Sequence, residues 1–92
     1  MDLQENVKGL LSSCITPLID HEDELKIDVR QEGEAGAETG YAILADLYVN
    51  QEDVGKIIGR QGRTIKSLRT LARALGAKYG ARVEVEIVEE DK

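Results

Sequence analysis

The chain contains 92 residues, with 12 Lys and Arg against 18 Asp and Glu, which gives a formal net charge of −6. This length corresponds to one small domain with room for a single core and too little for a deep catalytic cavity, so we do not expect an enzyme. One Cys, one His, no Phe and no Trp exclude an internal disulfide, a conventional zinc site and a platform of base-stacking aromatics, and we expect no cofactor.

The first apolar pattern begins at the N-terminus. Apolar residues at spacings of three and four predict a helix from about Asp2 toward Asp20, which Pro17 bends or ends. Cys14 lies on the apolar face, which favours a small core side chain over a reactive thiol. His21 follows in an acidic link, which favours a solvated turn residue over a catalytic base. An acidic N-terminus and the lack of a long apolar stretch predict a cytoplasmic protein with no membrane segment.

Two alternating segments come next. Leu25, Ile27 and Val29 alternate with charged residues, which predicts a strand with one buried face. Residues 41–49 alternate in the same way and predict a second strand, paired antiparallel with the first. Between them, Gln31–Gly40 has three Gly, three Glu and no large apolar residue, which predicts a long mobile hairpin loop.

The second half of the chain begins with a short helix. Asn50, with Asp53 three residues later, predicts a weak capping box and a helix that starts at Gln51. Gly59 and Gly62 interrupt this helix. Its apolar face consists of Val54, Ile57 and Ile58.

A longer helix and a last strand complete the chain. The helix is predicted from Arg63 to about Leu75, with Gly76 as its stop, and the alternation from Arg82 to Val88 predicts the strand. At 100° per residue, the helix has an apolar face and a separate basic face. The apolar face contains Ile65, Leu68, Leu71, Ala72 and Leu75. The basic face contains Lys66, Arg69 and Arg73.

The charge is distributed unevenly over these elements. Residues 1–53 carry a net charge of −10, residues 54–82 carry +8 without one acidic residue, and residues 83–92 carry −4. A segment without carboxylates, in a chain so rich in them, is a candidate anion-binding surface. A basic helix face that is merely solvated explains the charge equally well.

The turn between the two predicted helices, Gly59-Arg60-Gln61-Gly62, lies inside this basic segment. Glycine at both ends allows a tight reversal and leaves the backbone open to close approach. The helix that follows directs its unsatisfied N–H groups and the positive end of its dipole at the turn, which makes a small seat for phosphate oxygens. Arg60, Arg63 and Lys66 are best placed to surround a phosphate there. The alternative for Arg60 and Gln61 is a plain solvated turn.

The stretch from Ile57 to Ile65, IIGRQGRTI, resembles the I-I-G-x-x-G-x-x-I signature of the KH domain. The element order is similar to the prokaryotic type II arrangement, which implies an α+β fold of order α-β-β-α-α-β, with a three-stranded mixed sheet packed against three helices. We expect one domain over residues 1–92, with a short acidic tail at 89–92. The segments PLIDHEDEL and EDVGKIIGRQGRTIKSLR are similar, more narrowly, to the KhpA family of small bacterial RNA-binding proteins.

This resemblance implies a groove for about four unpaired nucleotides, with the GxxG turn gripping the RNA backbone. The residues expected to bind RNA are Lys56, Ile57, Ile58, Gly59, Arg60, Gln61, Gly62, Arg63, Ile65 and Lys66. Core packing is the stronger interpretation of Val54, Ile57, Ile58 and Ile65. Lys78 and Arg82 are assigned to the surface.

The resemblance also implies a biological setting. Members of the KhpA family are cytoplasmic, have no known catalytic activity, form homodimers or heterodimers, and are associated with a larger KH-containing partner, KhpB (also called Jag or EloR). The implied roles are RNA chaperone or post-transcriptional regulator, and cell shape. The chain is thus expected to bind single-stranded RNA with low sequence specificity. The alternatives are a dimerisation or protein-interaction adaptor with little RNA affinity and, less favoured, a DNA-binding helix-turn-helix protein.

Overall fold

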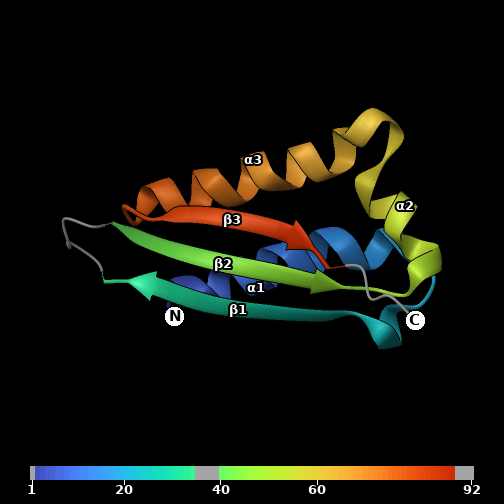
Figure 1. Cartoon of the computed structure of the whole chain (residues 1–92), viewed down its shortest axis with the longest axis horizontal. Helices are drawn as coiled ribbons and strands as arrows, with labels where there is room; N and C mark the ends of the chain where they lie inside the picture. The colour runs from blue at the N-terminus through green and yellow to red at the C-terminus, as the bar shows by residue number, and fades with distance from the viewer. Residues whose placement is uncertain (1, 35–39, 89–92) are drawn as a thin grey trace.

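The structure is a computed structural model that describes residues 2–34 and 40–88. Its elements follow the predicted order of helix, strand, strand, helix, helix, strand (Figure 1). The elements are α1 (Leu3–Ile15), β1 (Lys26–Gly33), β2 (Tyr41–Tyr48), α2 (Val54–Ile58), α3 (Arg63–Lys78) and β3 (Arg82–Ile87). Short 3₁₀ turns at Thr16–Leu18, Glu22–Glu24, Gln51–Asp53 and Arg60–Gly62 join several of them.

The three strands form one mixed sheet in the order β1-β2-β3. β1 and β2 are antiparallel, as predicted for the hairpin, and β2 and β3 are parallel. In Figure 1, α1 lies behind the sheet and α3 runs along β3. The strand order makes β3 an edge strand, and α3 packs against it. This arrangement agrees with the expected α+β fold.

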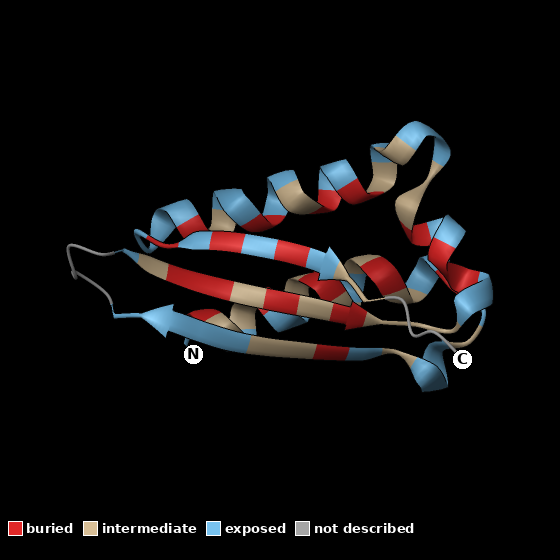
Figure 2. Cartoon of the chain, viewed as in Figure 1, coloured by how far each residue is buried: buried red, intermediate tan, exposed pale blue. Residues whose placement is uncertain are grey.

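The core lies between the sheet and helices α1 and α3. β2 and β3 bury mainly alternate residues against the helices, as their banding in Figure 2 shows, whereas Ile27 is the one buried residue of β1. The fully buried large side chains include Val7, Leu11, Ile15, Ile43, Leu47, Ile57, Val83 and Val85. Cys14 is half-buried against this cluster, consistent with a packing role. Leu71, predicted on the apolar face of α3, is 49% exposed because it lies at the margin of that face.

Local signals explain the limits of α1. The side chain of Asp2 accepts a hydrogen bond from the Glu5 N–H at 2.9 Å, which caps the first turn. The α-helix ends at Ile15, before the predicted limit near Asp20, because Pro17 lies in a 3₁₀ turn directly after it.

The predicted loop at Gln31–Gly40 is shorter than expected. β1 continues to Gly33, and Gln31 to Gly33 pair with Ile43 to Tyr41 on β2. These residues have exposed side chains and no hydrophobic alternation, so backbone pairing alone keeps them in the strand. Residues 35–39 of that loop and the acidic tail at 89–92 lie outside the described residues.

The prediction that Gly76 ends the second helix is wrong. α3 continues to Lys78, and the chain leaves it through Gly80, which has a φ of +70°. Gly76 is instead buried where α3 meets β3. A Cβ at this position would lie 2.5 Å from Val83 Cγ2 and 2.7 Å from the Ala81 carbonyl oxygen. The close packing of α3 against β3 therefore accounts for glycine at position 76.

This contact predicts opposite effects for two Gly→Ala changes inside helices. We expect Gly76→Ala to destabilise the protein by about 1–3 kcal/mol through overpacking. Gly9→Ala on α1, where a Cβ has nothing within 4 Å, should stabilise it by about 0.5–1 kcal/mol because alanine favours the helix. Urea unfolding of both variants measures the difference, and a Gly76→Ala variant as stable as Gly9→Ala would contradict the packing assigned to Gly76.

Candidate nucleic-acid interface

The turn between α2 and α3 depends on its two glycines. Gly59 has φ +76° and ψ 177°, and a Cβ on it would lie 2.7 Å from the Thr64 Cβ. Gly62 adopts a left-handed conformation (φ +73°) at the N-cap of α3. Between them, Gln61 is the one non-glycine residue with a positive φ (+57°) in the described chain. The two ends of the turn thus adopt backbone conformations that residues with a Cβ disfavour, which accounts for glycine at both positions.

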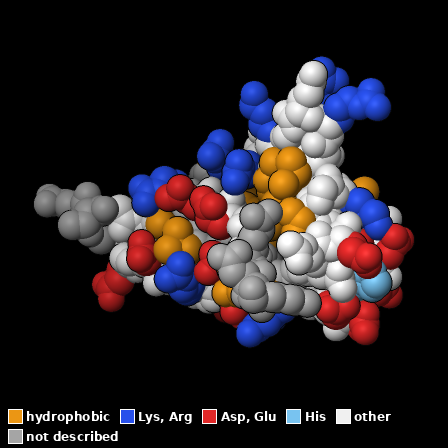
Figure 3. Space-filling view, turned by 45° about the vertical axis from the view of Figure 1, so that its right-hand side comes forward, with side chains coloured by type: hydrophobic (Ala, Val, Ile, Leu, Met, Phe, Trp, Pro, Cys, Tyr) orange, Lys and Arg blue, Asp and Glu red, His pale blue; other side chains and the backbone are white. Residues whose placement is uncertain are grey.

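The turn projects from the molecule and exposes basic groups. Arg60, Gln61, Arg63 and Lys66 are all exposed, and Figure 3 shows Lys and Arg side chains around the projecting tip. The Arg63 guanidinium donates a hydrogen bond to Gln61 Oε1 at 3.1 Å. The Arg63 N–H donates to the Arg60 carbonyl, but no described side chain caps the N-terminus of the 16-residue α3. The N–H groups of Thr64 and Ile65, which follow in the first turn, therefore remain available to an anion.

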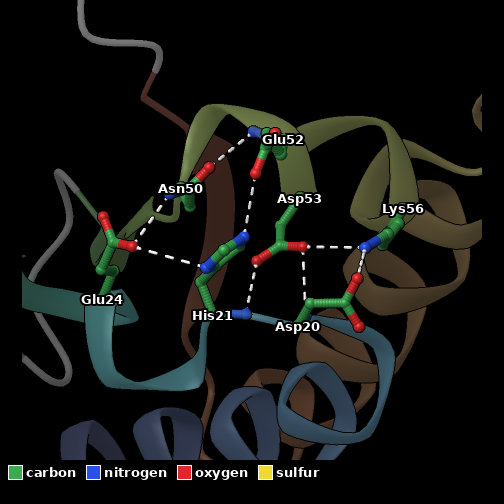
Figure 4. Close-up of polar contacts among 7 residues, drawn as sticks. All are labelled: Asp20, His21, Glu24, Asn50, Glu52, Asp53 and Lys56. Atoms are coloured by element: carbon green, nitrogen blue, oxygen red, sulfur yellow. Dashed lines mark hydrogen bonds and ion pairs between the residues drawn. The ribbon is translucent and has the colours of Figure 1, made fainter.

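Lys56 lies in a different environment from the other basic residues of the site. Its ammonium group donates to the carboxylates of Asp20 and Asp53, the latter at 3.1 Å. The hydrogen bond to Asp20 and then that to Asp53 raise the pKa of Lys56 above its ordinary value. Figure 4 shows the three side chains together. Lys56 is therefore already ion-paired on the side of α2 next to the α1–β1 connection.

Asp53 is the centre of this polar cluster. Its carboxylate has no exposed surface and accepts the N–H groups of Asp20 at 3.1 Å and His21 at 2.9 Å. Burial alone would raise the pKa of Asp53, but these two N–H donors and the Lys56 ammonium hold it below its ordinary value. The cluster therefore ties the chain after α1 to the residue directly before α2.

The cluster corrects the predicted capping box. Asn50 does cap, since its side-chain oxygen accepts the Glu52 N–H at 2.8 Å, but Asp53 turns inward and the α-helix begins only at Val54. The His21 ring is partly exposed, with Nε2 3.0 Å from a Glu52 oxygen and Nδ1 3.7 Å from a Glu24 oxygen (Figure 4). His21 is thus a turn residue as predicted, but one held by both its backbone and its ring.

A groove of about 440 Å³ lies beside the turn, between the helices and β3. Its lining consists of Ile58, Ile65, Arg69, Glu86 and Ile87. Two of these, Ile58 and Ile65, were predicted site residues, and Arg69 was predicted only as part of the basic face of α3. Glu86 and Ile87 were missed, because they come from the last strand of the chain, which pairs in parallel with β2.

The buried apolar candidates divide into two groups. Ile58 is half-buried and Ile65 is 7% exposed, and both border the groove. Ile57 is fully buried and Val54 is 9% exposed, so these two residues belong to the core beneath the turn. Ile57 therefore supports the turn by packing and has no surface with which to contact a ligand.

The β3 side of the groove carries backbone groups. The Val88 N–H donates to the Leu47 carbonyl of β2, so the alternate residues Val85 and Ile87 direct their backbone groups to the free edge. Arg69 Nε donates to the Val85 carbonyl at 3.0 Å, which fixes its guanidinium on the wall of the groove. Figure 3 shows hydrophobic side chains below the basic tip, flanked by Lys and Arg.

The order of the elements, the mixed sheet and a glycine-bounded turn between two helices beside a groove define a type II KH domain. The family model for the KhpA/KhpB KH domain matches residues 8–87. The chain belongs to this family, and family membership agrees with the expectation that the protein is not an enzyme.

Three relatives illustrate the similarity. The RNA-binding protein KhpA of Bacillus subtilis is 36% identical over 90% of this chain and 94% of its own length. The protein of the same name from Borreliella burgdorferi is 42% identical over 87% of this chain and 89% of its own. The one from Chlamydia pneumoniae is 39% identical over 91% of this chain and 99% of its own.

Solved structures support the fold. Era from Aquifex aeolicus bound to GDP and aluminium fluoride superposes with a TM-score of 0.65 at 16% identity, over 98% of this chain and 33% of that one. Era in complex with MgGDPNP and a segment of 16S ribosomal RNA gives a TM-score of 0.62 at 18% identity, with the same coverage. The chain thus spans about a third of these structures. Among the described residues, no helix has the length and apolarity needed to cross a membrane.

Proposed function

We propose that this protein binds single-stranded RNA, about four nucleotides at a time and with low overall sequence specificity, through the Gly59–Gly62 turn and the adjoining groove. The observation that carries the proposal is the uncapped N-terminus of α3, which opens beside the groove at an exposed basic turn. Such a turn holds phosphate oxygens through backbone N–H groups and nearby cations.

Different side chains contact the phosphates and the bases of the RNA. Arg60, Gln61, Arg63 and Lys66 surround the phosphate seat, and Gly59 and Gly62 shape it. Ile58 and Ile65 offer an apolar floor for unstacked bases, Ile57 supports that floor from the core, and Lys56 holds α2 in place through its ion pairs. Phosphate contacts supply affinity without reading sequence.

The groove favours unpaired RNA over a duplex. An apolar floor next to a phosphate seat can be occupied only when bases leave their stack and expose a face and an edge. Because the whole chain has a net charge of −6, favourable contact with phosphates is confined to one basic region. This charge therefore opposes nonspecific binding to duplexes. The names of the relatives, which are RNA-binding proteins, support RNA as the ligand.

The same proposal covers the cellular role. A single KH domain with modest affinity suits a cytoplasmic RNA chaperone or post-transcriptional regulator, and family membership supports action as a homodimer or with a larger KhpB-like KH partner. A role in cell shape would follow through the RNAs bound in that complex.

The test is a fluorescence-anisotropy titration of a labelled, unstructured 12-nucleotide RNA, repeated from 50 to 300 mM salt. Three cations at the phosphate seat predict a slope of log affinity against log salt of about −2. A 12-base-pair RNA duplex is the matched control and should bind at least about tenfold more weakly. No binding of the single strand at 50 mM salt, or equal binding of the duplex, would contradict the proposal.

A dimerisation adaptor is the second candidate. The observation in its favour is the exposure of Leu71 (49%) on α3 and of Tyr79 (42%) directly after it. Size-exclusion chromatography over the same salt series separates the two functions. An RNA-free dimer without measurable RNA affinity would favour the adaptor.

A further inference from the structure

Among the residues that the structure describes, Glu86 is the one acidic residue in the lining of the groove. The other lining residues are three isoleucines and Arg69. Glu86 is exposed, and among the residues that the structure describes it forms no ion pair within 4 Å. A carboxylate repels phosphate, so its presence in a groove that is proposed to hold RNA requires a specific explanation.

The position of Glu86 is also unfavourable for folding. Glu86 is the direct register partner of Asp46 on β2, and Glu84 lies two residues earlier on the same face of β3. Asp46 is 3.5 Å from the Arg30 guanidinium, and Glu84 is 3.1 Å from that of Arg82. Like charges opposite one another destabilise a sheet. Asp46 and Glu84 have cationic partners here, whereas Glu86 has none in the part of the chain that the structure describes. Residues that break a local rule in this way are typical of functional sites.

Arg69 supplies the complementary chemistry. The hydrogen bond from its Nε to the Val85 carbonyl fixes the guanidinium on the same groove wall. Its Nη groups make no hydrogen bond or ion pair with other described residues. The groove therefore presents an acceptor-only carboxylate, donor N–H groups and apolar surfaces within one space.

We propose that Glu86 and Arg69 form a subsite for a guanine base of the bound RNA. The Watson–Crick edge of guanine carries two adjacent donors, N1–H and the 2-amino group, which match the two oxygens of a carboxylate, and next to them the O6 acceptor, which matches Arg69. The isoleucines contact the faces of the base. This inference rests on the proposed single-stranded RNA binding and adds a preference at one of the four positions.

The other bases satisfy these groups less well. Uracil has a single N–H between two carbonyl oxygens, both of which a carboxylate repels. Adenine and cytosine each present one amino group beside an acceptor nitrogen, so only one oxygen of Glu86 receives a hydrogen bond. A good bidentate pair discriminates between bases by about 1–3 kcal/mol, and the groove is open to solvent, so we expect a preference near the lower limit.

The test uses labelled RNA hexamers of sequence UUXUUU, in which X is G, inosine, A, C or U. We expect the G hexamer to bind about five- to tenfold more tightly than the all-U hexamer. Inosine keeps N1–H and O6 but lacks the 2-amino group, so its hexamer should bind with an affinity between those two. Anisotropy titration at one fixed salt concentration measures all five.

Two isosteric variants assign the preference to its residue. Glu86→Gln should reduce the preference for G over U to less than about twofold, chiefly by improving U binding, because it removes a negative charge from the groove. Glu84→Gln, two residues away on the same strand but outside the groove lining, removes the same charge and should keep the full preference. Thermal unfolding checks that both variants fold.

The outcomes separate this subsite from the proposed function. Equal binding of all five hexamers by the parent, or a preference for G that survives Glu86→Gln, would overturn the guanine subsite and leave RNA binding intact. Absence of binding to every hexamer and to the 12-nucleotide RNA would overturn the proposed function, and the subsite with it.

Discussion

Replacing Arg60 and Gln61 together by aspartate is expected to reduce the affinity for single-stranded RNA by on the order of 30-fold or more. The change places two carboxylates on the exposed turn next to the N-terminus of α3, which no described side chain caps. There they repel phosphate and accept hydrogen bonds from the N–H groups of α3 that would otherwise bind it. Aspartate tolerates the left-handed conformation of residue 61, so the fold should persist. RNA anisotropy and circular dichroism measure the two effects.

A matched control carries the same change in net charge elsewhere. Gln4→Asp with Lys8→Asp adds the same negative charge on α1, and the Gln4 side chain contacts Gln31 on β1, remote from the turn. The RNA affinity of this variant should fall by no more than about threefold, which is the part of the effect that comes from overall charge. Equal losses in the two double variants would show that overall charge, and not the turn, determines RNA binding.

Replacing Asp53 by alanine is expected to lower the melting temperature by about 10 °C or more. The change leaves the N–H groups of Asp20 and His21 without their acceptor and takes one carboxylate from Lys56. Glu52→Ala, which removes an exposed carboxylate from the preceding position, should shift the melting temperature by no more than about 3 °C. Similar melting temperatures for Asp53→Ala and Glu52→Ala would contradict the central role of Asp53.

The same carboxylate makes stability depend on pH in acid. Because folding lowers the pKa of Asp53 below its ordinary value of 3.8, its contribution is complete above that pH and is lost as pH falls through the lower folded-state pKa. Urea unfolding at pH 6, 4 and 3 should therefore show a loss of stability on acidification that is smaller in Asp53→Asn. An identical loss in the parent and in Asp53→Asn would assign the effect to other carboxylates.

Elements with a strong local signal were predicted well. The apolar period of α1, the alternation in β1 and β2, and the glycines around the turn each reflect a preference of the local chain, and each element formed where expected. The ends of elements that depend on contacts with residues far away in the sequence were not predicted. β1 extends to Gly33 because β2 offers backbone partners, and Gly76 lies inside α3 because β3 packs against it.

The amino-acid sequence by itself determined the order of the elements, the basic segment and the glycine-bounded turn, since these follow from periodicity, charge and backbone freedom over a few neighbouring residues. Only the tertiary structure decided how the surrounding side chains are used. It turned Asp53 inward to bind Asp20, His21 and Lys56, and the parallel pairing of β3 with β2 placed Glu86 in the lining of the same groove as Arg69. Burial and long-range pairing are properties of the closed fold, which no local pattern in the chain encodes.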